Sequence, residues 1–248
     1  MKQKTIRAII VDDEDLARGL VKEYLSVHPQ VEIVAECGNG FDAVKAVSEL
    51  LPDLMFLDIQ MPKLSGFEVL ELLNEPPAVV FVTAYDQYAV KAFEVHAVDY
   101  LLKPYSRERF DEALAHALER VGKEPAVRPE KAVAETRAAG ERIERILIKE
   151  GSKVLIIPAE KIDYIEAQDD YISVRADGKS HLKMQRMADL EASLDPRRFV
   201  RIHRSFILNV ERLAKIELYA KDSRNAILKD GTQLPVSRSG YDKLKEML

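Results

Sequence analysis

Five side chains in the first half of the sequence could together accept a phosphoryl group. An acidic pair, Asp12-Asp13, follows one short apolar run, and Asp58, Thr83 and Lys103 each follow another. Carboxylates that gather at one place repel one another unless a hard cation such as Mg2+ neutralises them. A carboxylate can attack phosphorus, and a lysine charge can stabilise the outer phosphoryl oxygens. This order of residues therefore predicts an acyl-phosphate site with Asp58 as the acceptor and a bound Mg2+.

The apolar runs before these residues predict the elements that position them. We expect parallel strands, covered on both faces, at residues 6–11, 31–36, 54–57, 78–82 and 100–102. Between these strands, apolar residues recur at the spacing of a helix. Leu16, Leu20 and Tyr24, for example, should share one face. Ser106 is the expected N-cap of a last helix that ends near residue 121. This pattern predicts a doubly wound α/β sheet, which binds ligands at the carboxyl ends of its strands.

Two local alternatives accompany this hypothesis. Taken singly, Asp12 or Asp13 would more often be a helix N-cap than a metal ligand, and only the joint order of the residues favours a site. Pro104 fixes the chain direction after Lys103, with a cis peptide bond as one option.

The second half of the sequence has a different period. Short β-rich segments occur at residues 143–149, 154–157, 162–166, 171–175, 213–219 and 225–228. Turn signals such as Asp177-Gly178 and Asp230-Gly231 separate some of them. Helices are expected only at residues 187–194 and 237–248. The pattern predicts a mostly β domain of antiparallel strands with few helices at residues 141–248. A linker at 122–140, with two prolines and a glycine at each end, would join it to a first domain at residues 1–121.

Charge and composition support two modules with different partners. The net charge of −5 is the sum of an acidic first part, −9 over residues 1–121, a linker of +1 and a basic last part, +3 over residues 141–248. The single cysteine, Cys37, excludes an intramolecular disulfide, fits a reducing compartment and is expected to be a small buried apolar residue. No apolar run approaches the roughly 20 residues that a membrane helix needs, and no signal peptide is visible. We therefore expect a cytoplasmic protein without a membrane partner.

A basic segment of the second half, residues 197–205, could bind nucleic acid. Five of its nine residues are basic if His203 is included, and apolar side chains lie between them. Lys183, Arg186 and Arg238 are further candidates for the same face. The segment is equally typical of a solvated strand in which alternate residues are charged, so the residues alone leave both readings open. His181 and His203 are isolated, and this half shows no set of residues typical of an enzyme.

The motifs of the first half resemble the receiver domain of bacterial response regulators over about residues 5–121. They are residues 9–14, residues 57–62 with Gly66, residues 82–84 and residues 98–104. The resemblance implies that Mg2+ is bound by Asp12, Asp13, Asp58 and the backbone carbonyl of Gln60. It also implies that Tyr100 is an aromatic switch residue, that a sensor histidine kinase or a small phosphodonor supplies the phosphoryl group, and that the phosphorylated chain dimerises through a surface within residues 84–121.

The second half resembles the LytTR DNA-binding domain, so the whole chain resembles response regulators of the LytR/AlgR type. The matching segments are residues 162–167, 199–209 and 234–238. In that family, loops rather than a recognition helix enter the major groove of double-stranded DNA, at repeated sites in promoters. The resemblance implies that Arg204 and Arg238 read bases. The loop at residues 168–171, with Asp170 as an acceptor for cytosine, is a weaker candidate. Further expected DNA contacts, mostly to the backbone, are Lys183, Arg186, Arg198, Arg201 and His203.

Two other functions compete with a phosphorylation-controlled transcription factor. The β module could instead bind protein or RNA, and a gel shift with its salt dependence would separate these cases. The first half could be a phosphatase that resembles the haloacid dehalogenase group, which has a second aspartate two residues after its nucleophile. Gln60 occupies that position here, which counts against an enzyme. We therefore expect stoichiometric phosphoryl acceptance and no turnover of a metabolite.

Overall fold

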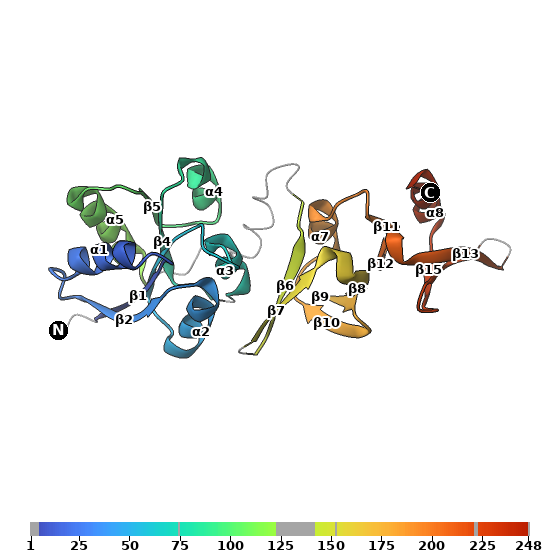
Figure 1. Ribbon diagram of the computed structural model, residues 1–248, viewed down its shortest axis with the longest axis horizontal. Coiled ribbons are helices and arrows are strands. Elements are labelled where there is room, and N and C mark those ends of the chain that lie inside the picture. The colour runs from blue at the N-terminus through green and yellow to red at the C-terminus, as the bar shows by residue number, and fades with distance from the viewer. Residues whose placement is uncertain (1–4, 74, 123–141, 152, 221–222, 248) are drawn as a thin grey trace. The chain divides into compact units, whose positions relative to one another are not determined.

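The computed structural model forms two compact units, Met1–Thr136 and Arg137–Leu248 (Figure 1). It describes residues 5–73, 75–122, 142–151, 153–220 and 223–247. The predicted linker at 122–140 lies outside the described residues except for Gly122. Each unit has hydrophobic cores of its own.

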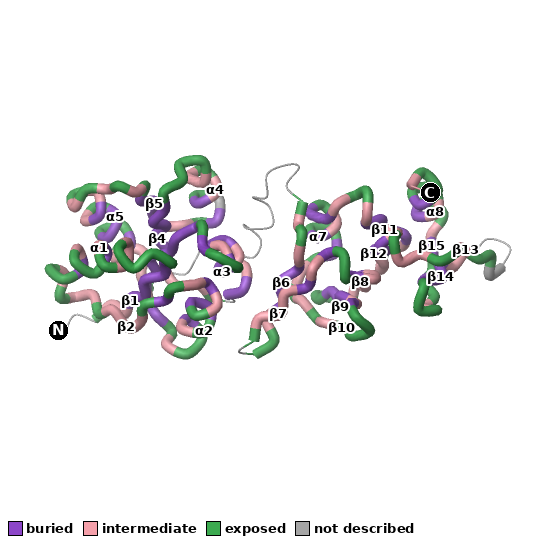
Figure 2. The backbone as a smooth tube through the Cα atoms, viewed as in Figure 1, coloured by how far each residue is buried: buried purple, intermediate pink, exposed green. Residues whose placement is uncertain are grey.

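Five parallel strands form the sheet of the N-terminal unit: β1 (Ile6–Val11), β2 (Val31–Cys37), β3 (Leu54–Leu57), β4 (Ala78–Thr83) and β5 (Asp99–Leu102). Their order in the sheet is β2-β1-β3-β4-β5. All four residues of β3 are buried, as expected of a central strand that is covered on both faces. Most residues of the neighbouring strands β1 and β4 are buried as well (Figure 2). The predicted doubly wound α/β fold is confirmed. In this order the direction of winding changes between β1 and β3, which is where such folds bind ligands.

The helices of this unit are α1 (Asp15–Leu25), α2 (Gly40–Leu50), α3 (Gly66–Leu72), the short η1 (Asp86–Tyr88), α4 (Ala89–Glu94) and α5 (Arg107–Arg120). Helices α1 and α5 share one core with the strands, and α2 and α3 lie on the opposite side (Figure 1). Ser106 caps α5, as predicted, because its side chain accepts a hydrogen bond from the amide of Arg109 at 3.2 Å. The predicted face of α1 is only partly buried: Leu16 is 90% exposed, Leu20 is half-buried, Tyr24 packs against the core, and Val21 and Leu25 are the fully buried residues.

The C-terminal unit is built mainly from antiparallel strands. They are β6 (Arg145–Glu150), β7 (Lys153–Pro158), β8 (Ile162–Gln168), β9 (Tyr171–Ala176), β10 (Lys179–Lys183), β11 (Phe199–His203), β12 (Phe206–Asn209), β13 (Leu213–Ala220), β14 (Ser223–Leu228) and β15 (Gln233–Val236). The sheets have the orders β10-β9-β8-β12-β11, β13-β14-β15 and β6-β7. Among the described residues, α7 (Met187–Ser193), α8 (Arg238–Met247) and the short helices η2 (Ala159–Lys161) and η3 (Val210–Arg212) accompany them. The predicted mostly β fold with few helices is confirmed, and β10, β11, β12 and β15 are additional to the predicted strands.

Strands β11 and β12 separate two hydrophobic cores within this unit. Phe199 and Ile207 contribute to a core with α7, and Val200, Ile202 and Leu208 contribute to a core with β14, β15 and α8. Alternate residues of a strand point to opposite faces, so a single strand can serve both cores. Helix α8 packs directly on β11. The chain segment that carries the predicted DNA contacts is thus fixed from both sides.

Within the described part of the chain, no helix is long and apolar enough to cross a membrane.

Candidate functional site

The two neighbouring strands β1 and β3 place Asp12 and Asp58 next to each other. Asp12 directly follows β1 and Asp58 directly follows β3, and Val11 pairs with Leu57 in the register of these strands. The amide of Asp58 donates a hydrogen bond of 2.9 Å to the carbonyl of Val11. Asp12 and Asp58 are only 3% and 6% exposed. Their position is therefore set by backbone pairing, at the edge predicted from the sequence.

Asp13 completes a cluster of three carboxylates that fits a hard cation. One carboxylate oxygen from each of Asp12, Asp13 and Asp58 lies within 4.8 Å of the other two, and Asp13 is exposed while its partners are buried. Burial raises the pKa of Asp12, although the Lys103 ammonium and the amide of Glu14 act in the opposite direction. Buried oxygen ligands with excess negative charge are what Mg2+ binds in proteins. The acidic cluster could therefore hold a metal ion.

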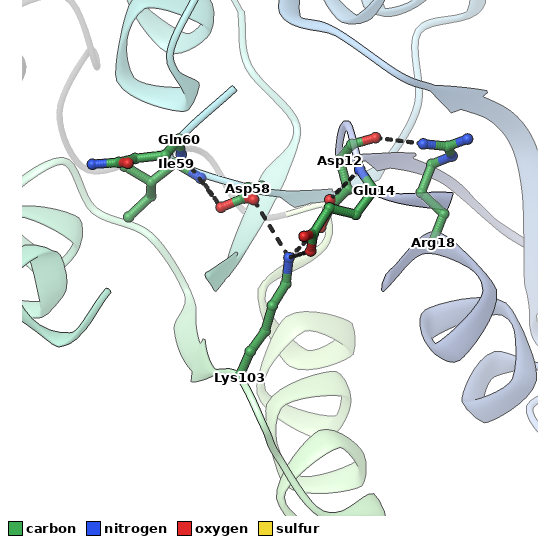
Figure 3. A network of polar contacts seen from close by, with 7 residues as sticks. All are labelled: Asp12, Glu14, Arg18, Asp58, Ile59, Gln60 and Lys103. Atoms are coloured by element: carbon green, nitrogen blue, oxygen red, sulfur yellow. Dashed lines mark hydrogen bonds and ion pairs between the residues drawn. The ribbon is translucent and has the colours of Figure 1, made fainter. Parts of the chain in front are cut away.

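Lys103 brings a positive charge into this cluster from the end of β5 (Figure 3). Its Nζ lies 2.7 Å from Oδ2 of Asp12, 3.4 Å from Oδ2 of Asp58 and 3.4 Å from Oε2 of Glu14. Burial by itself would lower the pKa of Lys103, but the bond to Asp12 and the nearby charge of Asp58 outweigh it, so the pKa is raised. The lysine is thus held in its charged form. The peptide bond between Lys103 and Pro104 is cis, the option left open by the sequence.

Thr83 ends β4 with a buried hydroxyl that has no hydrogen-bond partner among the described residues. The residue is 0% exposed. Leaving such a hydroxyl unpaired costs about 1–3 kcal/mol, so buried polar groups without partners are rare and often belong to functional sites. The hydroxyl is therefore available to a ligand oxygen.

The loop after β3 holds the second oxygen of Asp58. Oδ1 accepts hydrogen bonds from the amides of Ile59, at 2.6 Å, and Gln60, at 3.3 Å, while Oδ2 faces Lys103 (Figure 3). A Cβ atom at Gly66 would lie 2.3 Å from the carbonyl oxygen of Asp58, so this close approach requires glycine. The Gln60 side chain points elsewhere, and its Nε2 donates to the Tyr88 hydroxyl at 3.2 Å.

Tyr100 is buried under the segment that follows β4. Its hydroxyl donates a hydrogen bond to the carbonyl of Tyr85, two residues beyond Thr83. Burial raises the pKa of Tyr100 to about 12, and the charges of Asp86 and Asp58 add to the effect. The Tyr100 side chain is thus hydrogen-bonded to the segment that directly follows Thr83.

Two further residues of this site were not predicted from the sequence. Glu14 contacts Lys103, and Arg18 donates a hydrogen bond of 2.7 Å from Nη1 to the backbone carbonyl of Asp12. Glu14 could have been included because it directly follows the acidic pair. Arg18 lies one helical turn after Glu14. It can reach the carbonyl of Asp12 only because α1 begins at Asp15, and the sequence did not predict that start.

Three of the eight predicted DNA-binding residues line a hollow in the C-terminal unit. The hollow has a volume of about 410 Å3, and it is lined by Arg201, His203, Arg204, Ser237, Ser239 and Lys243. Arg204 is exposed in the turn between β11 and β12, and Arg238, also exposed, begins α8 beside Ser237. The structure therefore brings the two predicted base-reading arginines to adjoining elements. Ser239 and Lys243 were not predicted.

The remaining predicted DNA contacts occupy other positions of the unit. Lys183 lies on β10, at the sheet edge opposite β11, and its Nζ donates to the carbonyl of Leu147 at 2.9 Å. Arg186 is exposed at the N-cap of α7, and Asp170 is exposed between β8 and β9. The guanidinium Nε of Arg198 lies 3.3 Å from Glu211. No described contact joins these residues to the hollow, so their predicted roles stay predictions.

A parallel sheet with clustered aspartates, threonine and lysine at one edge, followed by a β unit with arginines on adjoining elements, defines a two-domain regulatory protein. Comparison with known families gives the particular group. Residues 8–115 match the response regulator receiver domain, and residues 152–248 match the LytTr DNA-binding domain.

Similar proteins align with this chain over nearly their whole length. The chain is 36% identical to an uncharacterized response regulatory protein of Yersinia pestis, over 98% of both chains. It is 33% identical to the sensory transduction protein LytT of Bacillus anthracis, and 35% identical to the transcriptional regulatory protein BtsR of Salmonella typhi. Each of these two matches covers 98% of this chain and 99% of the relative. The chain therefore belongs to the response regulators of two-component systems that join a receiver domain to a LytTR DNA-binding domain.

Proposed function

We propose that Asp58 is the phosphoacceptor and that its phosphorylation controls sequence-specific DNA binding by the LytTR domain. The observation that carries this proposal is the pairing of two groups around Asp58. These are the Lys103 ammonium, 3.4 Å from Oδ2 of Asp58, and the buried hydroxyl of Thr83 at the end of the neighbouring strand β4, which has no partner among the described residues. A phosphoryl oxygen could bind both the Lys103 ammonium and the Thr83 hydroxyl.

In the proposed reaction, an oxygen of Asp58 forms a bond to phosphorus. The bond from phosphorus to the donor breaks, and the donor, a kinase histidine or the acyl group of a small phosphodonor, keeps the electron pair. Lys103 is already charged and stabilises the developing negative charge. Asp12, Asp13, Asp58 and the carbonyl of Gln60 would hold Mg2+, which supplies further charge neutralisation when it is bound.

The consequence of phosphorylation would be a repacking of the segment after β4. Thr83 would turn to the new acceptor, and the Tyr85 segment and the buried Tyr100 ring would move with it. The adjoining surface of α4 and β5 exposes Val90 (70%), Phe93 (58%) and Leu102 (43%). Apolar side chains that lie in water favour a partner, so we propose that this surface forms a homodimer of the phosphorylated chain. A dimer would suit two copies of a site in double-stranded DNA.

The proposed chemistry is stoichiometric, and a sensor histidine kinase is the proposed donor. The position two residues after Asp58, where the competing phosphatase class has an acid, holds an amide that contacts Tyr88. An amide cannot deliver a proton to a leaving group, which supports acceptance and slow loss of the phosphoryl group without turnover.

The test is labelling with acetyl phosphate and Mg2+. The wild-type chain should form an acid-labile acyl phosphate, and Asp58→Asn should form none. Asp86→Asn is a matched control, because Asp86 is an exposed carboxylate just after β4 and should not affect labelling. Full labelling of Asp58→Asn would disprove the assignment.

The DNA-binding part of the proposal has its own test. Arg238→Ala should weaken binding to the preferred duplex by about 1–3 kcal/mol and relax one base position, because an arginine can contact two acceptors of a guanine. Selection from a pool of duplexes with a randomised segment, with and without acetyl phosphate, would supply that duplex. Unchanged affinity and specificity of Arg238→Ala would remove Arg238 from the interface.

A further inference from the structure

Two segments that carry the proposed base-reading arginines are attached to one backbone carbonyl. The carbonyl oxygen of Ile202 accepts a hydrogen bond of 2.8 Å from the amide of Ser237 and one of 3.0 Å from its hydroxyl. The same hydroxyl accepts a bond of 3.0 Å from the amide of Gly240 and so caps the first turn of α8. Arg204 lies two residues after Ile202, and Arg238 directly follows Ser237. Both arginines are therefore anchored close to a single point of β11.

Gly240 allows α8 to pack directly against the backbone carbonyl of Ile202. A Cβ atom at position 240 would lie 2.0 Å from the carbonyl oxygen of Ile202 and 2.5 Å from its carbon. These are backbone atoms, which cannot rotate aside as a flexible side chain can. A larger residue would push the start of the helix, and Arg238 with it, away from β11.

Arg201 holds the other segment, the turn between β11 and β12. Its Nη2 donates to the backbone carbonyl of Arg204 at 2.7 Å, and its Nη1 lies 2.8 Å from a carboxylate oxygen of Glu191 in α7. Glu191 also lies 3.9 Å from Nζ of Lys243 in α8. A planar guanidinium is suited to fixing two acceptors at once, whereas a lysine is not. Arg201 thus connects the turn between β11 and β12 to helix α7 of the same unit.

We propose that Arg201, Ser237 and Gly240 are positioning residues that set the placement of Arg204 relative to Arg238 and so determine sequence specificity. The inference rests on the proposed DNA-binding function. It assigns Arg201 a task different from the DNA-backbone contact expected from the sequence. Base reading by arginine depends on a defined geometry in the groove, and binding groups must be held to within about 0.5 Å by their supporting residues. A contact to a DNA phosphate would instead act through charge and leave specificity unchanged.

Glu191→Gln separates the two roles of Arg201, because they predict opposite results. If Arg201 positions the turn, weakening its bond to Glu191 should lower the ratio of specific to non-specific affinity by about tenfold, within the range for disturbing one arginine–base contact. If Arg201 contacts phosphate, loss of the Glu191 charge should release it and raise both affinities together. Glu217→Gln is the matched control, since Glu217 forms an ion pair of 2.7 Å with Lys215 on β13 and the change in net charge is the same.

Arg201→Lys provides a second, independent readout. The substitution keeps the charge but cannot bridge Glu191 and the Arg204 carbonyl. The affinity ratio should fall while the slope of log affinity against log salt concentration stays as in the wild-type chain, because no phosphate contact is lost. Gly240→Ala should also lower the ratio, and thermal unfolding would show whether that variant folds.

The experiment uses the full chain and the duplex that the wild type selects from a randomised pool, with a scrambled duplex of equal length as the non-specific probe. If Glu191→Gln and Arg201→Lys both keep the wild-type affinity ratio, the positioning role is overturned and the proposed function stands. If the wild-type chain selects no sequence at all, the proposed function itself fails.

Discussion

Replacing the Thr83 hydroxyl by a methyl group should have opposite effects on the two states of the receiver. Thr83→Val keeps the shape of the side chain and removes a buried polar atom that has no partner among the described residues. Because an unpaired buried hydroxyl costs about 1–3 kcal/mol, the unphosphorylated variant should be more stable than the wild type by about 1 kcal/mol. For a domain of this size that corresponds to a rise in melting temperature of roughly 3–6 °C.

The phosphorylated state should respond in the other direction. A hydroxyl that donates to an anionic oxygen contributes about 1.5–3 kcal/mol, and valine cannot make this bond. Calorimetry of the full chain, with and without beryllofluoride and Mg2+ as a phosphoryl mimic, measures both states. The transition that the mimic shifts in the wild type belongs to the receiver. The mimic should stabilise Thr83→Val less than it stabilises the wild type.

Thr232→Val is the matched control, because the Thr232 hydroxyl is exposed and donates to Asp230 at 2.9 Å. That variant should gain no stability, and the mimic should have its normal effect. A lower melting temperature for Thr83→Val without the mimic would refute the reasoning, since it would mean that the hydroxyl is already satisfied.

Two further predictions concern titrating groups. Burial raises the pKa of Cys37 to about 11. Alkylation of Cys37 at pH 8 should therefore be slow in the native chain and at least about a hundredfold faster after unfolding. Rapid alkylation of the native chain would contradict the burial of this thiol. Burial opposes ionisation of Asp99, but bonds from Arg109 and from His116, at 2.7 Å, outweigh it and the pKa is lowered. Because the folded pKa of Asp99 lies below its unfolded pKa of about 3.9, the ionised side chain stabilises the fold at pH values above about 3.9. This stabilisation is lost as the pH falls through the folded pKa. Asp99→Asn should therefore cost roughly 1–3 kcal/mol of unfolding free energy at pH 7, and in acid titrations this difference should disappear as the pH falls through the lowered folded pKa of Asp99.

The receiver could be predicted closely because its local signals agree with its fold. Strands covered on both faces appear as continuous apolar runs, and Asp12, Asp58 and Lys103 directly follow three of them, while Thr83 ends a fourth strand. Buried Cys37 was predicted for the same reason, and it is 3% exposed. The exposed Leu16 was not, since helical spacing indicates which residues share a face but not how far along the helix the core extends.

The LytTR domain was harder to predict because its strands carry charges at alternate positions. Strand β11 contains Arg201 and His203, so the sequence left open whether this segment is a solvated strand or a binding surface. The structure shows a strand whose Arg201 bonds to Glu191, and nothing in the spacing of these residues indicates that pair. Contacts between segments that are far apart in sequence depend on packing, which periodicity does not encode.

The position of β11 between two cores has a consequence for the speed of recognition. A loop that orders itself only on DNA loses conformational entropy at the moment of binding, at about 1–2 kcal/mol for each backbone residue. Here Val200 and Ile202 pack into one core and Phe199 into the other, so the residues beside the Arg204 turn are ordered when the domain folds. Encounter with DNA should then proceed nearly as a rigid-body collision steered by charge, with little delay for rearrangement at this turn.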